Sequence, residues 1–263
     1  MNDPKQILVE RDGHVARVTI NRPERRNAVS FAAWQSLAAS FENLAADPAV
    51  RVVVLTGAGD RAFCAGNDIS EFAEKRSTPE QIEIYDAVTT HAFEVIRGIE
   101  KPLVARVLGS AVGGGFELMQ LCDLRIAGAG ARFAMTPARL GLGYTLDDVQ
   151  SLVDRIGASA AREMLFTGRL FDAAEAERLG FVNRVVPDAE LDAAVDSCAA
   201  EIAGNAPLAI RAIKVAIGEA VKPPAERDRD RCDALAAACN ASEDYREGQR
   251  AFAERRSPRF RGR

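Results

Sequence analysis

The chain has few of the residues that metal and disulfide chemistry require. Among 263 residues it has two histidines, His14 and His91, and five cysteines with no Cys-x-x-Cys pair. A zinc site needs several His, Cys or carboxylate ligands at close spacing, and none of the usual spacings occurs. Unpatterned cysteines in a chain of this length indicate reduced thiols and a cytoplasmic protein. We therefore expect no bound metal.

The chain also has no long apolar run and no excess of positive charge. No uninterrupted apolar stretch approaches the roughly 20 residues that a membrane-spanning helix needs, and the amino terminus does not resemble a signal peptide. The formal net charge is −4, which gives no global basic field to attract nucleic acid. The expected partners therefore include neither a membrane nor nucleic acid.

Three common motifs of enzymes are missing as well. The glycines from Gly109 to Gly115 fit neither a P-loop nor the G-x-G-x-x-G spacing of dinucleotide-binding proteins. No G-x-S-x-G elbow occurs. Cys64 lies next to the turn that contains Gly66, but no histidine is near it in sequence to activate it as a nucleophile. Phosphate-loop, dinucleotide and serine-hydrolase chemistry are thus disfavoured.

What the chain does have is a glycine turn between a strand and a helix. The stretch Pro102–Glu117 reads as a short apolar strand, then Gly113, Gly114 and Gly115, then a helix with an acid in its first turn. Such a turn directs free N–H groups at one point, and the helix dipole adds positive potential there. The turn therefore suits an oxygen that becomes anionic during a reaction, with Glu117 as the nearest group for proton transfer.

A second glycine turn follows another buried strand. Ala65 and Gly66 come after the apolar run 51–56, and open α/β sheets place ligands beyond the carboxyl ends of their strands. If each turn supplies one N–H group, the pair forms an oxyanion hole. The alternative is that the glycines serve only tight turns and close packing.

Strands and helices alternate along the first two thirds of the chain, which indicates an α/β fold with parallel strands. A hairpin is predicted at 7–20, around Asp12-Gly13. The last third reads as helices only. We expect a core over residues 1–190 and a helical region over 191–263 that belongs to the same functional unit. The expected elements are strands at 7–10, 15–20, 51–56, 103–108, 123–127, 132–134 and 182–186, and helices at 31–44, 79–99, 149–156, 158–166, 173–179, 191–204, 207–221, 225–240 and 243–255.

Several motifs in order along the chain resemble those of the crotonase (enoyl-CoA hydratase/isomerase) superfamily. Together they cover essentially the whole chain. The motifs are Asn21-Arg-Pro, Asn27-Ala28, Phe63-Cys-Ala-Gly-Asn-Asp-Ile69, Gly109-Ser-Ala-Val-Gly-Gly-Gly-Phe-Glu117 and Phe133-Ala-Met-Thr-Pro-Ala-Arg-Leu-Gly141.

The resemblance implies a crotonase (ClpP-like) fold of repeated ββα units with a helical trimerisation region at the carboxyl end. It implies an enzyme of fatty acid metabolism that acts on an acyl-CoA thioester, with coenzyme A as part of the substrate and no permanently bound cofactor. The expected self-assembly is a homotrimer or a dimer of trimers.

The resemblance also implies the site residues. The thioester oxygen would lie between the N–H groups of Ala65 and Gly114, which would stabilise an enolate. Residues that would line the substrate or coenzyme A site are Arg25, Arg26, Ala28, Cys64, Gly66, Asn67, Asp68, Ile69, Gly113, Phe252 and Arg255.

One departure from the family pattern bears on the reaction. Family hydratases use two glutamates, and Glu117 matches the first. The second lies in a Pro-Glu pair in the segment that corresponds to Thr136-Pro137, where this chain has no acid. Hydration needs one group to activate water and one to protonate carbon. Asp147 and Asp148 are close in sequence, but they fit the capping of a helix that follows Thr145.

The stretch Thr136–Tyr144 and the carboxyl-terminal tail are similar to those of methylmalonyl-CoA decarboxylase-like members, although those have a histidine where this chain has Asn67. The resemblance favours single-acid chemistry, either decarboxylation or double-bond isomerisation, with Glu117, Tyr144 and Thr136 as catalytic residues. Tyr144 is alternatively a core-edge tyrosine. Hydration, as an enoyl-CoA hydratase, is the second hypothesis. The third is a non-catalytic acyl-CoA- or RNA-binding member, which would have no need of Glu117.

Overall fold

The chain begins with a β-hairpin that forms the edge of the main sheet. The computed structural model describes residues 5–263, except for the side chains of residues 147 and 148. Strands β1 (Ile7–Asp12) and β2 (Val15–Ile20) pair antiparallel. Gly13 in the turn has φ +55°, which suits glycine. The predicted hairpin is confirmed.

The main sheet has six strands in the order β1-β2-β3-β5-β7-β10. Beyond the hairpin all neighbours are parallel. The central strands carry apolar residues on both faces because helices cover both, and every residue of β3 is buried. The added strands are β3 (Val52–Gly57), β5 (Leu103–Val107), β7 (Leu124–Gly128) and β10 (Arg184–Val186).

A second, smaller sheet has the order β4-β6-β8-β9. Strands β4 (Ala62–Cys64), β6 (Ser110–Val112) and β8 (Arg132–Ala134) run parallel, and β9 (Phe171–Asp172) is antiparallel to β8. Of these strands only β8 was predicted. All four have two or three residues, so none of them shows a periodic pattern in the sequence. This sheet brings the end of β4 beside β6, and both precede the glycine turns.

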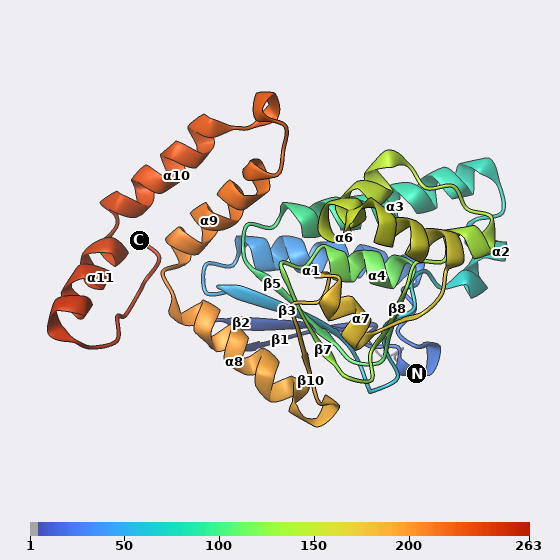
Figure 1. Ribbon diagram of the computed structural model, residues 1–263, viewed down its shortest axis with the longest axis horizontal. Coiled ribbons are helices and arrows are strands. Elements are labelled where there is room, and N and C mark those ends of the chain that lie inside the picture. Colours follow the sequence, from blue (N-terminus) through green and yellow to red (C-terminus); the bar gives the residue numbers. More distant parts are fainter. Residues whose placement is uncertain (1–4) are drawn as a thin grey trace.

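Helices cover both faces of the main sheet (Figure 1). Helices α1 (Phe31–Ala46), α3 (Pro79–Gly98) and α4 (Gly114–Gln120) share the larger apolar core. Helix α8 (Leu191–Gly204) packs on the other face through Leu191, Val195 and Ala199. The layer that covers the sheet thus continues to residue 204, past the expected division at 190.

Four helices connect these layers. They are α2 (Phe72–Lys75), α5 (Pro137–Leu140), α6 (Leu146–Thr167) and α7 (Ala173–Arg178). Two helices were predicted where α6 lies. Gly157 has non-helical angles there (φ 74°, ψ 160°), which separates the two helical segments.

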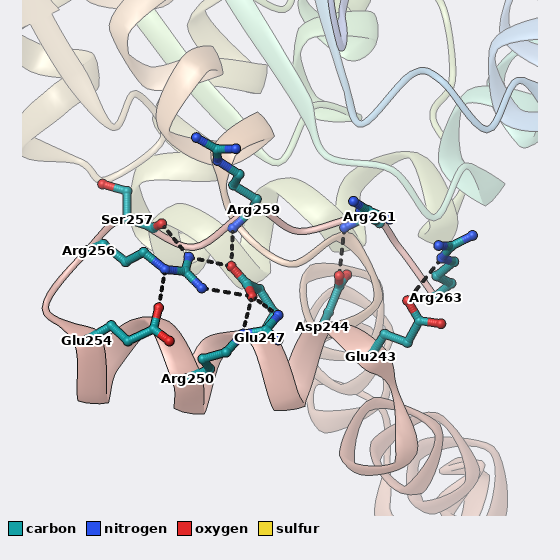
Figure 2. Close-up of polar contacts among 10 residues, drawn as sticks. All are labelled: Glu243, Asp244, Glu247, Arg250, Glu254, Arg256, Ser257, Arg259, Arg261 and Arg263. Atoms are coloured by element: carbon teal, nitrogen blue, oxygen red, sulfur yellow. Dashed lines mark hydrogen bonds and ion pairs between the residues drawn. The ribbon is translucent and has the colours of Figure 1, made fainter.

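The last helices extend away from the sheet as an arm made of α9 (Pro207–Ala220), α10 (Arg229–Ala241) and α11 (Glu243–Glu254) (Figure 1). Lys214 of α9 anchors the arm through an ion pair with Asp123 at 2.8 Å. Residues 255–263, the tail segment, fold back along α11 (Figure 2). The Asp244 carboxylate accepts the backbone N–H groups of Arg261 (2.6 Å) and Gly262 (2.7 Å), so α11 and the tail segment form one unit.

Candidate functional site

The glycine turn before α4 leaves backbone donors without partners at the helix start. Gly113 precedes the helix with φ 54° and ψ −127°, angles open to glycine alone. Its own N–H donates to the Ala134 carbonyl at 3.0 Å. Gly114 is the first residue of α4, and the first N–H groups of a helix have no intrahelical acceptor. The Gly114 N–H is therefore available to an external oxygen.

The two glycine turns meet, as predicted. A Cβ on Gly115 would lie 2.1 Å from the Cys64 carbonyl oxygen, so α4 packs directly against the end of β4. Gly66 has φ +89°, and a Cβ there would lie 3.0 Å from the Gly114 nitrogen. Glycine at both positions allows this close approach.

The second donor differs from the predicted one. The Ala65 N–H donates to the Arg26 carbonyl at 3.1 Å, which removes it as a free donor. Asn67 and Val29 form a parallel β-bridge, whose hydrogen bonds are made by the two residues that flank Asn67. The Val29 N–H donates to the Gly66 carbonyl, and the Asp68 N–H donates to the Val29 carbonyl. In such a bridge the N–H of the central residue points to the opposite side. The Asn67 nitrogen lies 3.8 Å from where a Gly114 Cβ would be, so its N–H is adjacent to that of Gly114.

Glu117 and Tyr144 are brought together at this place. Glu117 lies in the first turn of α4, and the Tyr144 hydroxyl donates to its Oε1 at 2.6 Å. Both side chains are half-buried. The contact joins α4 to the stretch that follows α5, and it brings together two residues that the sequence analysis named separately as catalytic candidates.

Three catalytic candidates remain. One of them, Thr136, lies at the start of α5, and the side chains of the other two are not among those that the structure describes. Thr136 is half-buried and precedes α5, and its side chain makes no capping hydrogen bond. Pro137 is buried. Asp147 and Asp148 fall in α6, but their side chains are outside the described part of the chain.

The loop after β4 is held by contacts that the sequence did not reveal. The Asp68 carboxylate pairs with Arg22 at 2.7 Å and accepts the Ser70 hydroxyl at 2.6 Å. Burial raises the pKa of Asp68, but these hydrogen bonds and the Arg22 charge outweigh it, and the pKa is lower than usual. Asp68 thus has a structural role. Ile69 is 70% exposed and is open to a ligand.

Two further loop contacts involve residues that sequence reasoning missed. The indole N–H of Trp34 donates to the Asn67 side-chain oxygen at 2.8 Å. The Arg22 guanidinium also donates to the Ala28 carbonyl at 2.7 Å, and Ala28 is itself buried. The signal for Arg22 was the Asn-Arg-Pro motif, whereas Trp34 appeared only as one apolar residue of a helix.

Cys64 does not contact the site through its side chain. It is fully buried beneath α4, and burial raises the pKa of its thiol to about 12. The prediction that Cys64 lines the substrate site is therefore wrong for its side chain. Its backbone carbonyl, in contact with Gly115, positions α4 instead.

The basic candidates are divided between two distant places. Arg25 and Arg26 are exposed next to the loop, and within residues 5–263 neither forms an ion pair. Phe252, 88% exposed, and Arg255 belong to the arm, and α11 lies at the opposite end of the molecule from α2 and α4 (Figure 1). A single chain therefore does not bring Phe252 and Arg255 to this site.

Neither a metal cluster nor a membrane span is found where the structure can be described. In that part of the chain no group of three or more His, Cys, Asp or Glu residues could hold a metal ion. Likewise, none of the described helices has the length and apolar character needed to cross a bilayer.

Comparisons with curated proteins find relatives along the whole chain. It is 36% identical to (E)-benzylidenesuccinyl-CoA hydratase of Thauera aromatica over 97% of this chain and 99% of that protein. It is 35% identical to crotonyl-CoA hydratase of Syntrophomonas wolfei over 97% of this chain and 98% of that protein.

Solved structures give the same result for the fold. An enoyl-CoA hydratase/carnitine racemase from Magnetospirillum magneticum matches with a TM-score of 0.92 at 36% identity, covering 99% of this chain and 97% of that one. An enoyl-CoA hydratase from Bacillus anthracis matches with a TM-score of 0.93 at 32% identity, covering 98% and 100%. The expected crotonase fold is confirmed. The enoyl-CoA hydratase/isomerase family model matches residues 10–263, and the chain belongs to this family of enzymes that act on acyl-CoA thioesters.

Proposed function

We propose that this enzyme stabilises a thioester enolate and moves a single proton with Glu117, in a decarboxylation or a double-bond isomerisation. The observation that carries the proposal is the 2.6 Å hydrogen bond from Tyr144 to Glu117, beside the start of α4. It puts a carboxylate and a hydroxyl next to the Gly114 N–H. An acid, a hydroxyl donor and a backbone donor then face one reacting group.

The enolate oxygen is held by the N–H groups of Gly114 and Asn67, not of Ala65. Both donors lie on segments that touch each other, and both point away from their own secondary structure. Removing one donor of an oxyanion hole costs roughly 2.7–4 kcal/mol of transition-state stabilisation. Because the donors are backbone groups, they need no reorganisation during the reaction.

Both reactions balance with one acid. In isomerisation, the Glu117 carboxylate takes a proton from the carbon next to the thioester, the enolate forms, and the same proton returns two carbons further along. In decarboxylation, the bond to the substrate carboxylate breaks, CO2 leaves, and the electron pair of that bond forms the enolate. The enolate then takes a proton from the Glu117–Tyr144 pair, and the pair regains a proton from water. In each case the Tyr144 hydroxyl orients Glu117 by its hydrogen bond.

Hydration is the second candidate, because the curated relatives described above are named hydratases. It requires a second group that activates water. At the segment where family hydratases have their second glutamate, the structure places Thr136 and the buried Pro137. Among the described side chains, neither of these two residues is an acid, and this favours the single-acid reaction.

The coenzyme A portion is proposed to extend over Ile69 toward Arg25 and Arg26, whose free charges suit its phosphates. Phe252 and Arg255 would reach it only from a neighbouring copy of the chain in a trimer or dimer of trimers. A cytoplasmic location remains our expectation.

An assay panel with crotonyl-CoA, a 3-enoyl-CoA and methylmalonyl-CoA tests the proposal. We expect turnover of the 3-enoyl or methylmalonyl thioester, and a loss of roughly 10²–10⁴-fold in kcat for isomerisation in Glu117→Gln, the usual contribution of a general acid–base. Release of CO2 from methylmalonyl-CoA that falls in both Glu117→Gln and Tyr144→Phe indicates decarboxylation. Fast hydration of crotonyl-CoA by the wild type would refute the single-acid reaction.

A further inference from the structure

The only tryptophan of the chain is buried behind the loop that carries Asn67. Trp34 is fully buried in α1 and packs against Phe93 with ring centroids 5.3 Å apart. Its indole N–H donates to the Asn67 Oδ1 atom at 2.8 Å. Position 34 therefore holds more than an apolar core residue, because its indole N–H donates to the site loop.

This hydrogen bond fixes which way the Asn67 amide faces. An indole N–H can only donate, so the atom that faces Trp34 must be the amide oxygen. The amide –NH₂ must then face away from the buried Trp34, and Asn67 as a residue is partly exposed. The usual ambiguity between the oxygen and nitrogen of an asparagine does not arise here.

The loop around Asn67 is fixed on both sides. The Val29 bridge holds the backbone of Gly66 and Asp68, and Glu71 accepts the N–H of Phe31 at the start of α1, at 2.9 Å. Asn67 therefore has one backbone N–H beside Gly114 and a side-chain –NH₂ that is directed away from Trp34. Among the described residues, that –NH₂ has no acceptor within hydrogen-bonding distance.

We propose that Asn67 is a specificity residue that recognises an acceptor oxygen on the acyl group near the thioester, and that Trp34 is the positioning residue that orients it. The inference rests on the proposed function, because it needs the thioester oxygen at Asn67 and Gly114. The –NH₂ group can donate but cannot accept, so it selects acyl groups that carry a carboxylate or a ketone over plain alkyl chains. A plain alkyl chain offers no acceptor oxygen and leaves the Asn67 –NH₂ without a hydrogen bond.

The test compares the dissociation constants of matched thioesters for the intact protein by calorimetry. Succinyl-CoA, which carries a carboxylate that this reaction cannot remove, is compared with propionyl-CoA to measure the carboxylate preference. Acetoacetyl-CoA against butyryl-CoA measures the ketone preference. We expect the wild type to prefer at least one oxygenated thioester by about tenfold or more, since a hydrogen bond to a charged group contributes on that order.

Asn67→Asp is the decisive variant, because its carboxylate still accepts from Trp34 but offers no donor. It should abolish a ketone preference and reverse a carboxylate preference. Trp34→Phe keeps a ring in the core but releases the amide, and should reduce the preference about threefold to tenfold. Gln35→Ala, on the exposed face of the same helix, is the matched control and should leave both ratios unchanged.

The inference is overturned if wild-type preferences are near one, or if Asn67→Asp leaves them as they were. Melting temperatures of each variant separate a lost preference from a lost fold, and Asn67→Asp remains informative if Trp34→Phe is unstable. Wild-type protein that binds none of the four thioesters would refute the proposed function as well. Binding of propionyl-CoA and butyryl-CoA without any oxygen preference refutes only this inference.

Discussion

At the scale of single residues, side chains that contact backbone shape the site loops. Asn27 is fully buried with φ 55°. Its side chain accepts the Arg22 N–H at 3.0 Å and donates to the carbonyls of Ala58 (2.9 Å) and Ala62 (2.6 Å). One side chain thus joins the loop before α1 to both ends of the turn between β3 and β4.

Asn27→Ala should lower the free energy of unfolding by about 2–4 kcal/mol, because it leaves buried carbonyls without donors and places alanine in a left-handed conformation. Urea unfolding measures the change. The partly exposed Asn21, whose side chain donates to the Lys5 carbonyl at 3.1 Å and forms no other hydrogen bond with the described residues, provides the control variant Asn21→Ala. Equal effects of the two substitutions would contradict the role assigned to Asn27.

Thiol reactivity provides a second test at this scale. Burial raises the pKa of both Cys64 and Cys122 to about 12, so at pH 7–8 both remain protonated and covered. Iodoacetamide should therefore modify the half-buried Cys232 and Cys239 well before them. Mass spectrometry over time gives the order, and early labelling of Cys64 would show that its thiol does face the site.

At the scale of elements, the position of α4 depends on close backbone packing. Gly115 lies against the end of β4 so closely that a methyl group there would overlap the Cys64 carbonyl. Helix α4 carries both the Gly114 N–H and Glu117. A displacement of this helix would therefore move a donor and an acid together.

Gly115→Ala should reduce kcat by a larger factor than it weakens binding of coenzyme A, because it shifts α4 while leaving Arg25 and Arg26 in place. Steady-state kinetics and binding of free coenzyme A measure the two effects. Gly218→Ala is the control, since a Cβ there meets nothing within 4 Å and α9 is an ordinary helix; it should be neutral or stabilising by about 0.4–1 kcal/mol. An active Gly115→Ala variant would contradict this packing argument.

At the scale of the whole molecule, the tail segment is fixed to the arm by buried carboxylates. Glu247 accepts hydrogen bonds from Arg256 and Arg250 and from the Arg259 N–H (Figure 2). These contacts hold the pKa of Glu247 far below its usual range. Since the folded-state pKa is depressed, this contribution to stability is present above the unfolded pKa of about 4.3 and is lost as the pH falls below it.

Glu247→Gln should release the tail segment without unfolding the sheet, because Asp244 and Glu247 hold different parts of it. Hydrogen exchange should then increase at the Arg259 amide at neutral pH, while the amides of β3 stay protected. Glu254→Gln, which removes a single contact of a half-exposed side chain with Arg256, should have little effect. Unchanged hydrogen exchange at the Arg259 amide in Glu247→Gln would contradict this role of Glu247.

The sequence allowed prediction of the hairpin, the long buried strands, the main helices and the meeting of two glycine turns. These features produce patterns over five or more residues. The donor that we propose at the second turn, the Asn67 N–H, lies two residues after the predicted Ala65, because sequence cannot show that the Arg26 carbonyl takes the Ala65 N–H. The Trp34–Asn67 bond was missed for the same reason, since its partners lie 33 residues apart.

The parallel bridge between Val29 and Asn67 has a consequence for how this protein can change over generations. The two proposed enolate donors are main-chain groups, so no point mutation other than to proline deletes either of them. Substitutions of the side chains around the acyl group can then alter which thioester fits, while the main-chain donors to the thioester carbonyl are retained. In such a site, point mutations can change the substrate range while enolate formation is preserved.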